Sequence, residues 1–209
     1  MKIINFDILS NPGEFELILL PTSIYQKKNG TVAVMKGGLL EQIVARCPSL
    51  PAQMGKGVET YGNCPAILSH IPNTKHPTKF MTFPVSPSTL RAKEPDHHVF
   101  HRLKGRFKKY ALLPGWCLLP RSDMVEFSSI KLKEIIRYYK LSKVALPFDL
   151  FTLGKEEVEK EQDRIMGIIS RIVPEGLSLI HHPKENPTGT FRTSVATSEV
   201  YFEEGETNA

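Results

Sequence analysis

Residues 143–172 read KVALPFDLFTLGKEEVEKEQDRIMGIISRI, and this stretch decides the fold class. Its apolar run, residues 144–146, is short and unbroken, as a buried strand of a parallel sheet is. Apolar residues then recur at helical spacing from Val158 to Ile172, which predicts a helix over 155–172. A strand, a loop and a helix in this order are typical of an α/β protein.

The rest of the chain repeats this order of elements. Predicted strands cover 2–8, 15–20, 65–70, 79–84, 143–147 and 177–180, and predicted helices cover 38–46, 123–139 and 155–172. Residues 86–120 are irregular, with short strand candidates at 110–113 and 116–119 around the Pro114-Gly115 turn. We therefore predict a three-layer α/β/α sandwich with a central mixed sheet.

Composition excludes several classes of protein. A hydrophobic share of 41% and a charged share of 23% over 209 residues exclude a wholly disordered chain. No apolar run reaches the roughly 18 residues of a membrane span, and the three cysteines form no C-x-x-C pair. We expect a cytoplasmic protein with no membrane partner, no cofactor and no metal site.

Charge divides the chain into parts. The formal net charge is +5, yet residues 183–209 contain two basic and five acidic residues and show no sustained period. We predict a domain over 1–182, with a basic insertion at about 86–120, and an acidic flexible tail over 183–209. The insertion has no acidic residue from His97 onward. Such a basic surface attracts phosphate, in nucleic acid or in a nucleotide.

Two loops are candidates for a ligand site. In α/β sheets, ligands bind beyond the carboxyl ends of the strands, where loops lead into helices. Residues 21–38 form one such loop, which ends in Lys36-Gly37-Gly38, and residues 148–154 form the other. Free N–H groups at the starts of the two following helices favour phosphate. Packing explains a pair of glycines at a helix start more often than a ligand does.

These stretches resemble a known family. Residues 34–43, VMKGGLLEQI, followed by Cys47-Pro48, are similar to the glycine-rich loop and first helix of macro domains. Residues 79–84, KFMTFP, resemble a strand that ends in Asn-Phe-Pro in many members. Residues 144–154 resemble the strand and loop that hold the second phosphate-binding site. The order and spacing of these pieces match over roughly residues 1 to 181.

The resemblance implies that the chain binds ADP-ribose or an ADP-ribosylated macromolecule. Some members of the family hydrolyse ADP-ribose from proteins or nucleic acids, and others remove a phosphate from it. Position by position, Asp7 matches the residue that contacts adenine, and Ser23 follows the strand after which the family carries asparagines. The diphosphate positions match Lys36, Gly37, Gly38, Thr152, Leu153 and Gly154.

A second copy of the loop motif occurs at residues 54–57, which read MGKG. It matches the family motif letter for letter, but the following residues 58–65 do not have the pattern of the required helix. We therefore assign the phosphate loop to residues 36–38 and predict a turn at 54–57.

Asp149 is the catalytic candidate. It lies beside the second loop, where a carboxylate orients a water or attacks an anomeric carbon in glycosidic chemistry. The competing interpretation is an aspartate that caps the loop. In the hydrolase branch that uses a lysine and an aspartate, the aspartate lies near the position of Gly154, so that mechanism does not transfer to Asp149. His97, His98 and His101 are interpreted as loop histidines rather than metal ligands.

Two alternatives remain open from the sequence. The first is a nucleic-acid-binding module, because residues 101–110 interleave basic and aromatic side chains, the combination used for phosphate contact and base stacking. Its candidate residues are Arg102, Lys104, Arg106, Phe107, Lys108 and Tyr110. The second is a degenerate macro fold that serves as a protein-interaction scaffold.

Overall fold

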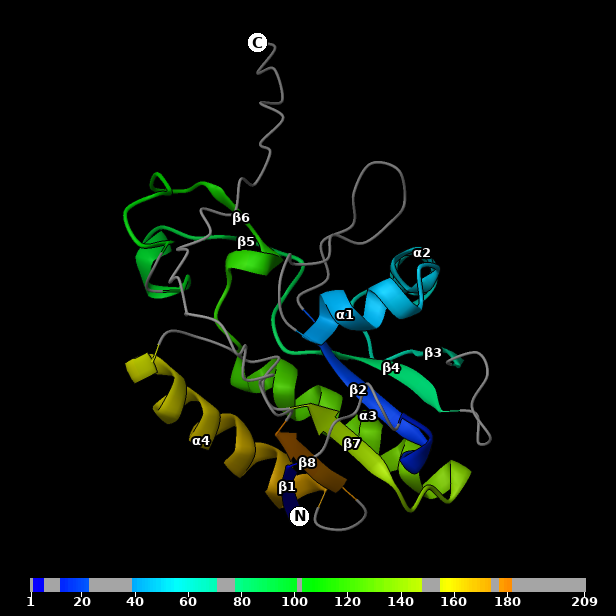
Figure 1. Cartoon of the computed structure of the whole chain (residues 1–209). Helices are drawn as coiled ribbons and strands as arrows, with labels where there is room; N and C mark the ends of the chain where they lie inside the picture. Colours follow the sequence, from blue (N-terminus) through cyan, green and yellow to red (C-terminus); the bar gives the residue numbers. More distant parts are fainter. Residues whose placement is uncertain are drawn as a thin grey trace, which may run out of the picture.

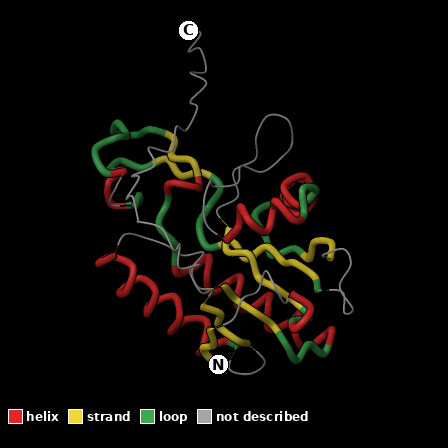
Figure 2. The backbone as a smooth tube through the Cα atoms, viewed as in Figure 1, coloured by secondary structure: helices red, strands yellow, loops and turns green. Residues whose placement is uncertain are grey.

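The computed structural model describes residues 2–5, 12–22, 39–70, 78–100, 103–147, 155–173 and 177–181. The strands of its central sheet are β1 (Lys2–Asn5), β2 (Leu17–Thr22), β3 (Ile67–His70), β4 (Lys79–Pro84), β7 (Val144–Pro147) and β8 (Leu177–His181). Their order is β1-β8-β7-β2-β4-β3 (Figures 1 and 2). Neighbouring strands are parallel except β3, which pairs antiparallel with β4 at the edge. The predicted mixed sheet is confirmed.

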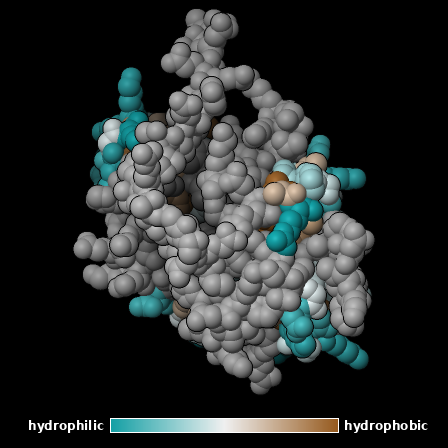
Figure 3. Space-filling model, in the orientation of Figure 1, coloured by the Kyte–Doolittle hydropathy of each residue, from teal (hydrophilic) through white to brown (hydrophobic). Residues whose placement is uncertain are grey.

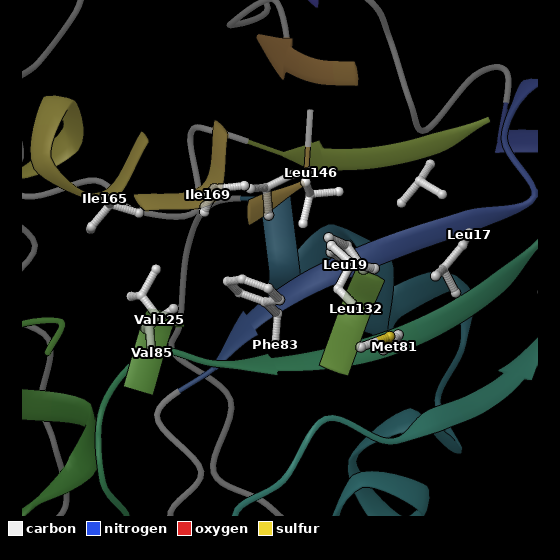
Figure 4. Packing of buried hydrophobic residues seen from close by; sticks show 12 residues of the cluster. Leu17, Leu19, Met81, Phe83, Val85, Val125, Leu132, Leu146, Ile165 and Ile169 are labelled. Carbon is white, nitrogen blue, oxygen red and sulfur yellow. The ribbon is translucent and has the colours of Figure 1, made fainter. Parts of the chain in front are cut away.

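Within the described part of the chain, four α-helices cover the two faces of the sheet: α1 (Leu39–Arg46), α2 (Leu50–Tyr61), α3 (Ser122–Tyr139) and α4 (Lys155–Ile172). The side chains of β2 alternate between the faces, as strand geometry requires. Ile18 and Leu20 belong to one core with residues of α1 and α2. Leu17 and Leu19 belong to the other core, with residues of α3 and α4 (Figure 4). The three-layer α/β/α architecture is therefore confirmed.

Predicted and observed boundaries agree closely in the second half of the chain. The bounds of α4 are those predicted, and those of α3, β7 and β8 differ by one residue. In the first half β4 has its predicted bounds, whereas β2 begins and ends two residues later than predicted. The signal was clear in α3 because Val125 and Leu132, one helical face, are fully buried.

The predicted turn at residues 54–57 is wrong, because these residues lie inside α2. A proline in the first turn favours the start of this helix, and Gly62, with φ +72°, ends it by donating its N–H to the Val58 carbonyl at 2.8 Å. Leu50 and Met54 are 1% exposed in the core. Their burial outweighs the low helix propensity of the two glycines.

The basic insertion forms a small unit with its own core. Its hairpin pairs β5 (Thr89–Arg91) with β6 (Leu112–Pro114), and residues 115–117 form a turn of 3-10 helix. The predicted strand at 110–113 corresponds to β6, which begins two residues later and ends one residue later, whereas the predicted strand at 116–119 is wrong. A Cβ on Gly115 would lie 2.6 Å from the Pro87 carbonyl oxygen, so the chain passes close to Pro87 at this glycine.

Two further expectations concern membranes and the tail. Among the helices that the structure describes, none is long and apolar enough to cross a bilayer. Residues 183–209, predicted to form the acidic tail, lie outside the described residues, and the domain limit at residue 182 stays a prediction.

Candidate functional site

The carboxyl ends of five parallel strands share one edge of the sheet. In order along this edge, the strands end at Asn5, His181, Pro147, Thr22 and Pro84. In Figure 1 the arrowheads of β7 and β8 point toward the side on which the insertion, with β5 and β6, stands. At about 4.8 Å between neighbouring strands, the edge from β1 to β4 spans about 19 Å. A ligand that extends along several strands fits such an edge.

The chain changes direction between β2 and β7, which are neighbours in the sheet. From β2 it continues to β3 and β4 on one side, and from β7 it continues to β8 on the other. The next helix after β2 is α1, which packs on one face, and the next after β7 is α4, which packs on the opposite face. This arrangement is a topological switch point, where open α/β sheets form their ligand crevice.

The predicted ligand-binding residues and the predicted catalytic residue Asp149 lie outside the described residues. The ligand-binding residues are Asp7, Ser23, Lys36, Gly37, Gly38, Thr152, Leu153 and Gly154. The elements that flank them are described, and in sequence Ser23 directly follows β2, Gly38 directly precedes α1 and Gly154 directly precedes α4. The two predicted phosphate loops thus start from the two strands of the switch point. Their assignment to residues and roles stays a prediction.

Three described polar residues near this edge, Thr22, Asn63 and Ser86, each have one buried side-chain oxygen, and we call them the polar cluster. The Thr22 Oγ1, Asn63 Oδ1 and Ser86 Oγ atoms are buried and have no hydrogen-bond partner among the described residues. Thr22 is 5% exposed and Ser86 is 0% exposed. A buried polar atom without a partner costs about 1–3 kcal/mol, so a set of three at one place requires an explanation.

Backbone contacts bring the polar cluster together. The Val85 N–H donates to the Thr22 carbonyl at 2.9 Å, which joins the end of β2 to the residue before Ser86. The Asn63 amide Nδ2 donates to the Ser86 carbonyl at 3.0 Å. This bond orients the amide, so Oδ1 is the atom left to accept. The polar cluster therefore offers two hydroxyls and one carbonyl oxygen, and it carries no charge.

Other buried hydroxyls of the sheet and helices differ from the polar cluster. Thr82 lies on β4 opposite Leu20 of β2. Its Oγ1 accepts a hydrogen bond from the Ala66 N–H at 2.8 Å. Thr78 donates to the Phe15 carbonyl at 2.6 Å, and Ser128 donates to the Pro84 carbonyl at 2.7 Å. Buried hydroxyls without a partner in the described part of the chain thus gather at the carboxyl edge.

No pattern in the sequence predicted the polar cluster. Thr22 and Ser86 are single polar residues at the ends of apolar strands, and Asn63 follows the glycine that ends α2. Polar residues at strand carboxyl ends are a usable signal in α/β proteins. The sequence did not predict that these three residues lie near one another, because their proximity depends on the pairing of β2 with β4.

Thiol and metal chemistry find no support among the described side chains. Burial raises the pKa of the Cys117 thiol to about 12 and also raises that of Cys47, which disfavours the nucleophilic thiolate in both. Among the described residues, no group of three His, Cys, Asp or Glu side chains could hold a metal ion. His97 forms an ion pair with Glu94 at 3.0 Å. His101 lies outside the described residues.

A pocket of about 190 Å³ opens where the insertion joins the sheet domain. Its lining residues are Leu90, His97, His98, Leu118, Leu119, Pro120 and Arg121. The Arg121 N–H donates to the Val85 carbonyl at 2.7 Å, and the Arg164 guanidinium donates to the Pro120 carbonyl at 2.9 Å. The insertion is therefore attached beside the polar cluster.

The structure divides the predicted nucleic-acid residues into two groups. Lys104, Arg106 and Lys108 are exposed, and Tyr110 is 53% exposed. Phe107 is partly buried and packs against the core of the insertion, and its role in stacking on a base stays a prediction. Arg102 lies outside the described residues.

The fold of this chain is similar to the folds of several solved structures. The chain is similar to the macrodomain of DarG from Thermus aquaticus, with 16% identity and a TM-score of 0.52 over 87% of this chain and 97% of that one. It is similar to the macrodomain of DarG from Mycobacterium tuberculosis, with 15% identity and a TM-score of 0.53 over 88% and 97%.

A third similar structure is DarTG from Thermosipho africanus in complex with ADP-ribose, with 11% identity and a TM-score of 0.53 over 85% of this chain and 40% of that one. No family model and no curated protein matches the sequence. Identities this low establish the fold alone, and they confirm at that level the resemblance to macro domains.

Proposed function

We propose that this chain, which has the macro-domain fold, binds ADP-ribose or a closely related nucleotide along the carboxyl edge of its sheet. The observation that carries the proposal is the switch point between β2 and β7, from which loops lead into helices on opposite faces. Dinucleotides bind in this place in open α/β sheets. A solved protein of the same fold, from Thermosipho africanus, is in complex with ADP-ribose.

The order of strands, taken with the predicted role of Asp7, supports one direction for the proposed ligand. Asp7 follows β1 at one edge of the sheet, so the adenine lies there and the diphosphate lies over β7 and β2. The second ribose then reaches the end of β2 and β4, where the polar cluster lies. Its hydroxyls are neutral donors and acceptors, which match the two hydroxyls and the amide oxygen of the polar cluster.

Hydrolysis is the finer function we propose to test. A water positioned against the anomeric carbon of the second ribose cleaves an ADP-ribosyl bond, and positioning is the main requirement for such a step. Asp149, two residues beyond β7, is the carboxylate assigned to orient that water. Asp149→Asn is expected to abolish turnover of an ADP-ribosylated substrate while it leaves ADP-ribose affinity within about threefold.

Calorimetric titration with ADP-ribose, with AMP and NAD as comparison ligands, tests the binding proposal. We expect one saturable site that prefers ADP-ribose. Gly37→Glu places a carboxylate in the first phosphate loop, and Asp7→Ala removes the adenine contact, so each is expected to abolish binding. Arg106→Gln with Lys108→Gln changes the charge of the insertion and serves as the control. Unchanged affinity in the Gly37→Glu or Asp7→Ala protein would refute the site.

A further inference from the structure

We propose that the insertion binds single-stranded nucleic acid through an exposed surface centred on Tyr110. The Tyr110 surface consists of Arg91, Lys93, Arg106, Lys108, Lys109 and Tyr110. This function is separate from the proposed nucleotide site and does not depend on it. The two uses of the chain can therefore be tested independently.

The Tyr110 surface is contiguous because of backbone pairing in the insertion. Arg91 pairs with Leu112 in the hairpin of β5 and β6, and the Tyr110 N–H donates to the Ala92 carbonyl at 2.9 Å. These contacts place Arg91 and Lys93 beside the segment that carries Lys108 and Lys109. Hydrophilic side chains project from the insertion at the upper left of Figure 3. Phosphate is attracted to such a concentration of positive charge.

The two acidic residues of the insertion are engaged in contacts of their own. The Glu94 carboxylate lies 3.0 Å from His97 Nδ1. Asp96 accepts a hydrogen bond at Oδ1 from the Gly105 N–H at 2.8 Å. Both carboxylates therefore have contacts within the insertion, and from Val99 to Ser122 the chain carries no acidic residue at all.

Tyr110 has a conformation that is costly for a tyrosine. Its φ is +64°, in the left-handed region that bulky side chains seldom occupy. Strain of this kind costs about 1–3 kcal/mol and clusters at functional sites. The residue is 53% exposed, and the Lys109 Nζ lies 5.4 Å from the centroid of its ring. Leu112, 57% exposed, adds an apolar surface nearby.

The platform beneath the Tyr110 surface is ordered by its own core. Ala92, Val99, Leu103, Leu113, Cys117 and Leu118 are buried together there. The Asp96–Gly105 hydrogen bond holds the turn at Gly105, whose φ is +77°. An exposed aromatic ring with a lysine beside it gives a base a surface to stack on.

An exposed ring favours a single strand over other polyanions. A duplex stacks its bases internally and offers phosphates only, and an acidic peptide offers carboxylates without planar faces. Unpaired bases use both the ring of Tyr110 and the surrounding cations. Stacking is thus the feature that separates the proposal from general attraction of negative charge.

Fluorescence anisotropy with a labelled oligothymidylate of about 12 nucleotides tests the proposal, because single-strand sites of this kind span about 4–16 nucleotides. We expect binding whose logarithm falls linearly with the logarithm of salt concentration. Arg106→Gln, Lys108→Gln and Lys109→Gln together should reduce that slope by about 2, since each lost phosphate contact removes about 0.7. Tyr110→Ala should weaken binding about tenfold, and Tyr110→Phe should not.

The matched control changes the same amount of charge elsewhere. Lys131→Gln, Lys133→Gln and Arg137→Gln lie on α3 and should leave both affinity and slope nearly unchanged. Single substitutions at Arg106 and Lys108 replace the triple change if that protein unfolds. Equal losses in the two triple variants, no effect of Tyr110→Ala, or equal competition by duplex DNA or polyglutamate would each overturn the proposal.

Discussion

The described polar groups at the two ends of the central sheet differ in their hydrogen bonding. At the amino end, Thr78 donates to the Phe15 carbonyl, and Glu16 Oε2 accepts from the Ser142 N–H, the Ser142 hydroxyl and the Lys143 N–H at 2.7, 3.1 and 2.9 Å. At the carboxyl end, Thr22, Asn63 and Ser86 keep buried polar atoms without a partner in the described part of the chain. The described polar groups at the amino end are hydrogen-bonded within the fold, whereas those of the polar cluster are not, and the proposed function assigns this unused capacity to a ligand.

Two isosteric substitutions, one at each end of the sheet, should show the largest difference in the free energy of unfolding. Thr78→Val removes the donor to the Phe15 carbonyl and should lower the free energy of unfolding by about 1–3 kcal/mol, because it removes one partner of a buried hydrogen bond. Thr22→Val removes no hydrogen bond to a described residue and should leave the free energy of unfolding unchanged or higher. Urea unfolding of both proteins measures the difference, and a larger loss in Thr22→Val would contradict the account.

A pair of glycine substitutions extends the comparison to the insertion above the carboxyl end. A Cβ at Gly115 would meet the Pro87 and Ser88 carbonyl oxygens at 2.6 and 2.9 Å, so Gly115→Ala should cost about 1–3 kcal/mol. Gly167 lies in α4 with nothing within 4 Å of its Cβ position. Gly167→Ala should therefore stabilise by about 0.5–1 kcal/mol. Thermal unfolding of the two proteins should give shifts of opposite sign, and shifts of one sign would count against this packing.

Substitution of Glu16 should have the smallest effect on the free energy of unfolding, and this effect should depend on pH. The Ser142 N–H that donates to Glu16 holds the pKa of that carboxyl below its ordinary value. The contribution is therefore full above the unfolded pKa of about 4.3 and is lost as pH falls through the lower folded value. Because the carboxylate is exposed, Glu16→Gln should cost only about 0.5 kcal/mol at pH 7.

The check on Glu16 is unfolding at several pH values. The difference between wild-type and Glu16→Gln proteins should be constant from pH 7 to about pH 5 and should shrink below about pH 4. A difference that grows as the pH is lowered would show that the sign of this interaction is wrong.

Sequence reasoning found the architecture because hydrophobic periodicity is a local signal. The pattern of 144–172 predicted β7 and α4, and the bounds of α4 agree with the prediction. It failed at 54–57, where tertiary burial of Met54 outweighs two helix-weakening glycines. It also failed in the insertion, where β6 pairs with β5 about 20 residues away rather than with its neighbour.

The sequence likewise predicted only part of the candidate site. Loops at the ends of strands were recognised from short motifs, whereas the polar cluster depends on long-range pairing that no local pattern encodes. Phe107 and Tyr110 illustrate the limit, since both are aromatic residues in one basic segment. Only the folded insertion reveals that Phe107 packs inward and Tyr110 outward.

The most direct test of the central claim is calorimetric titration of ADP-ribose into wild-type, Thr22→Val and Ser86→Ala proteins. The account predicts saturable binding to the wild type and an affinity about fivefold or more weaker in each variant, since each lost hydrogen bond to a ligand is worth about 1 kcal/mol. Both variants should unfold at the wild-type temperature or above it. Unchanged affinity combined with lower unfolding temperatures would contradict the claim, because the two hydroxyls would then serve the fold and not a ligand.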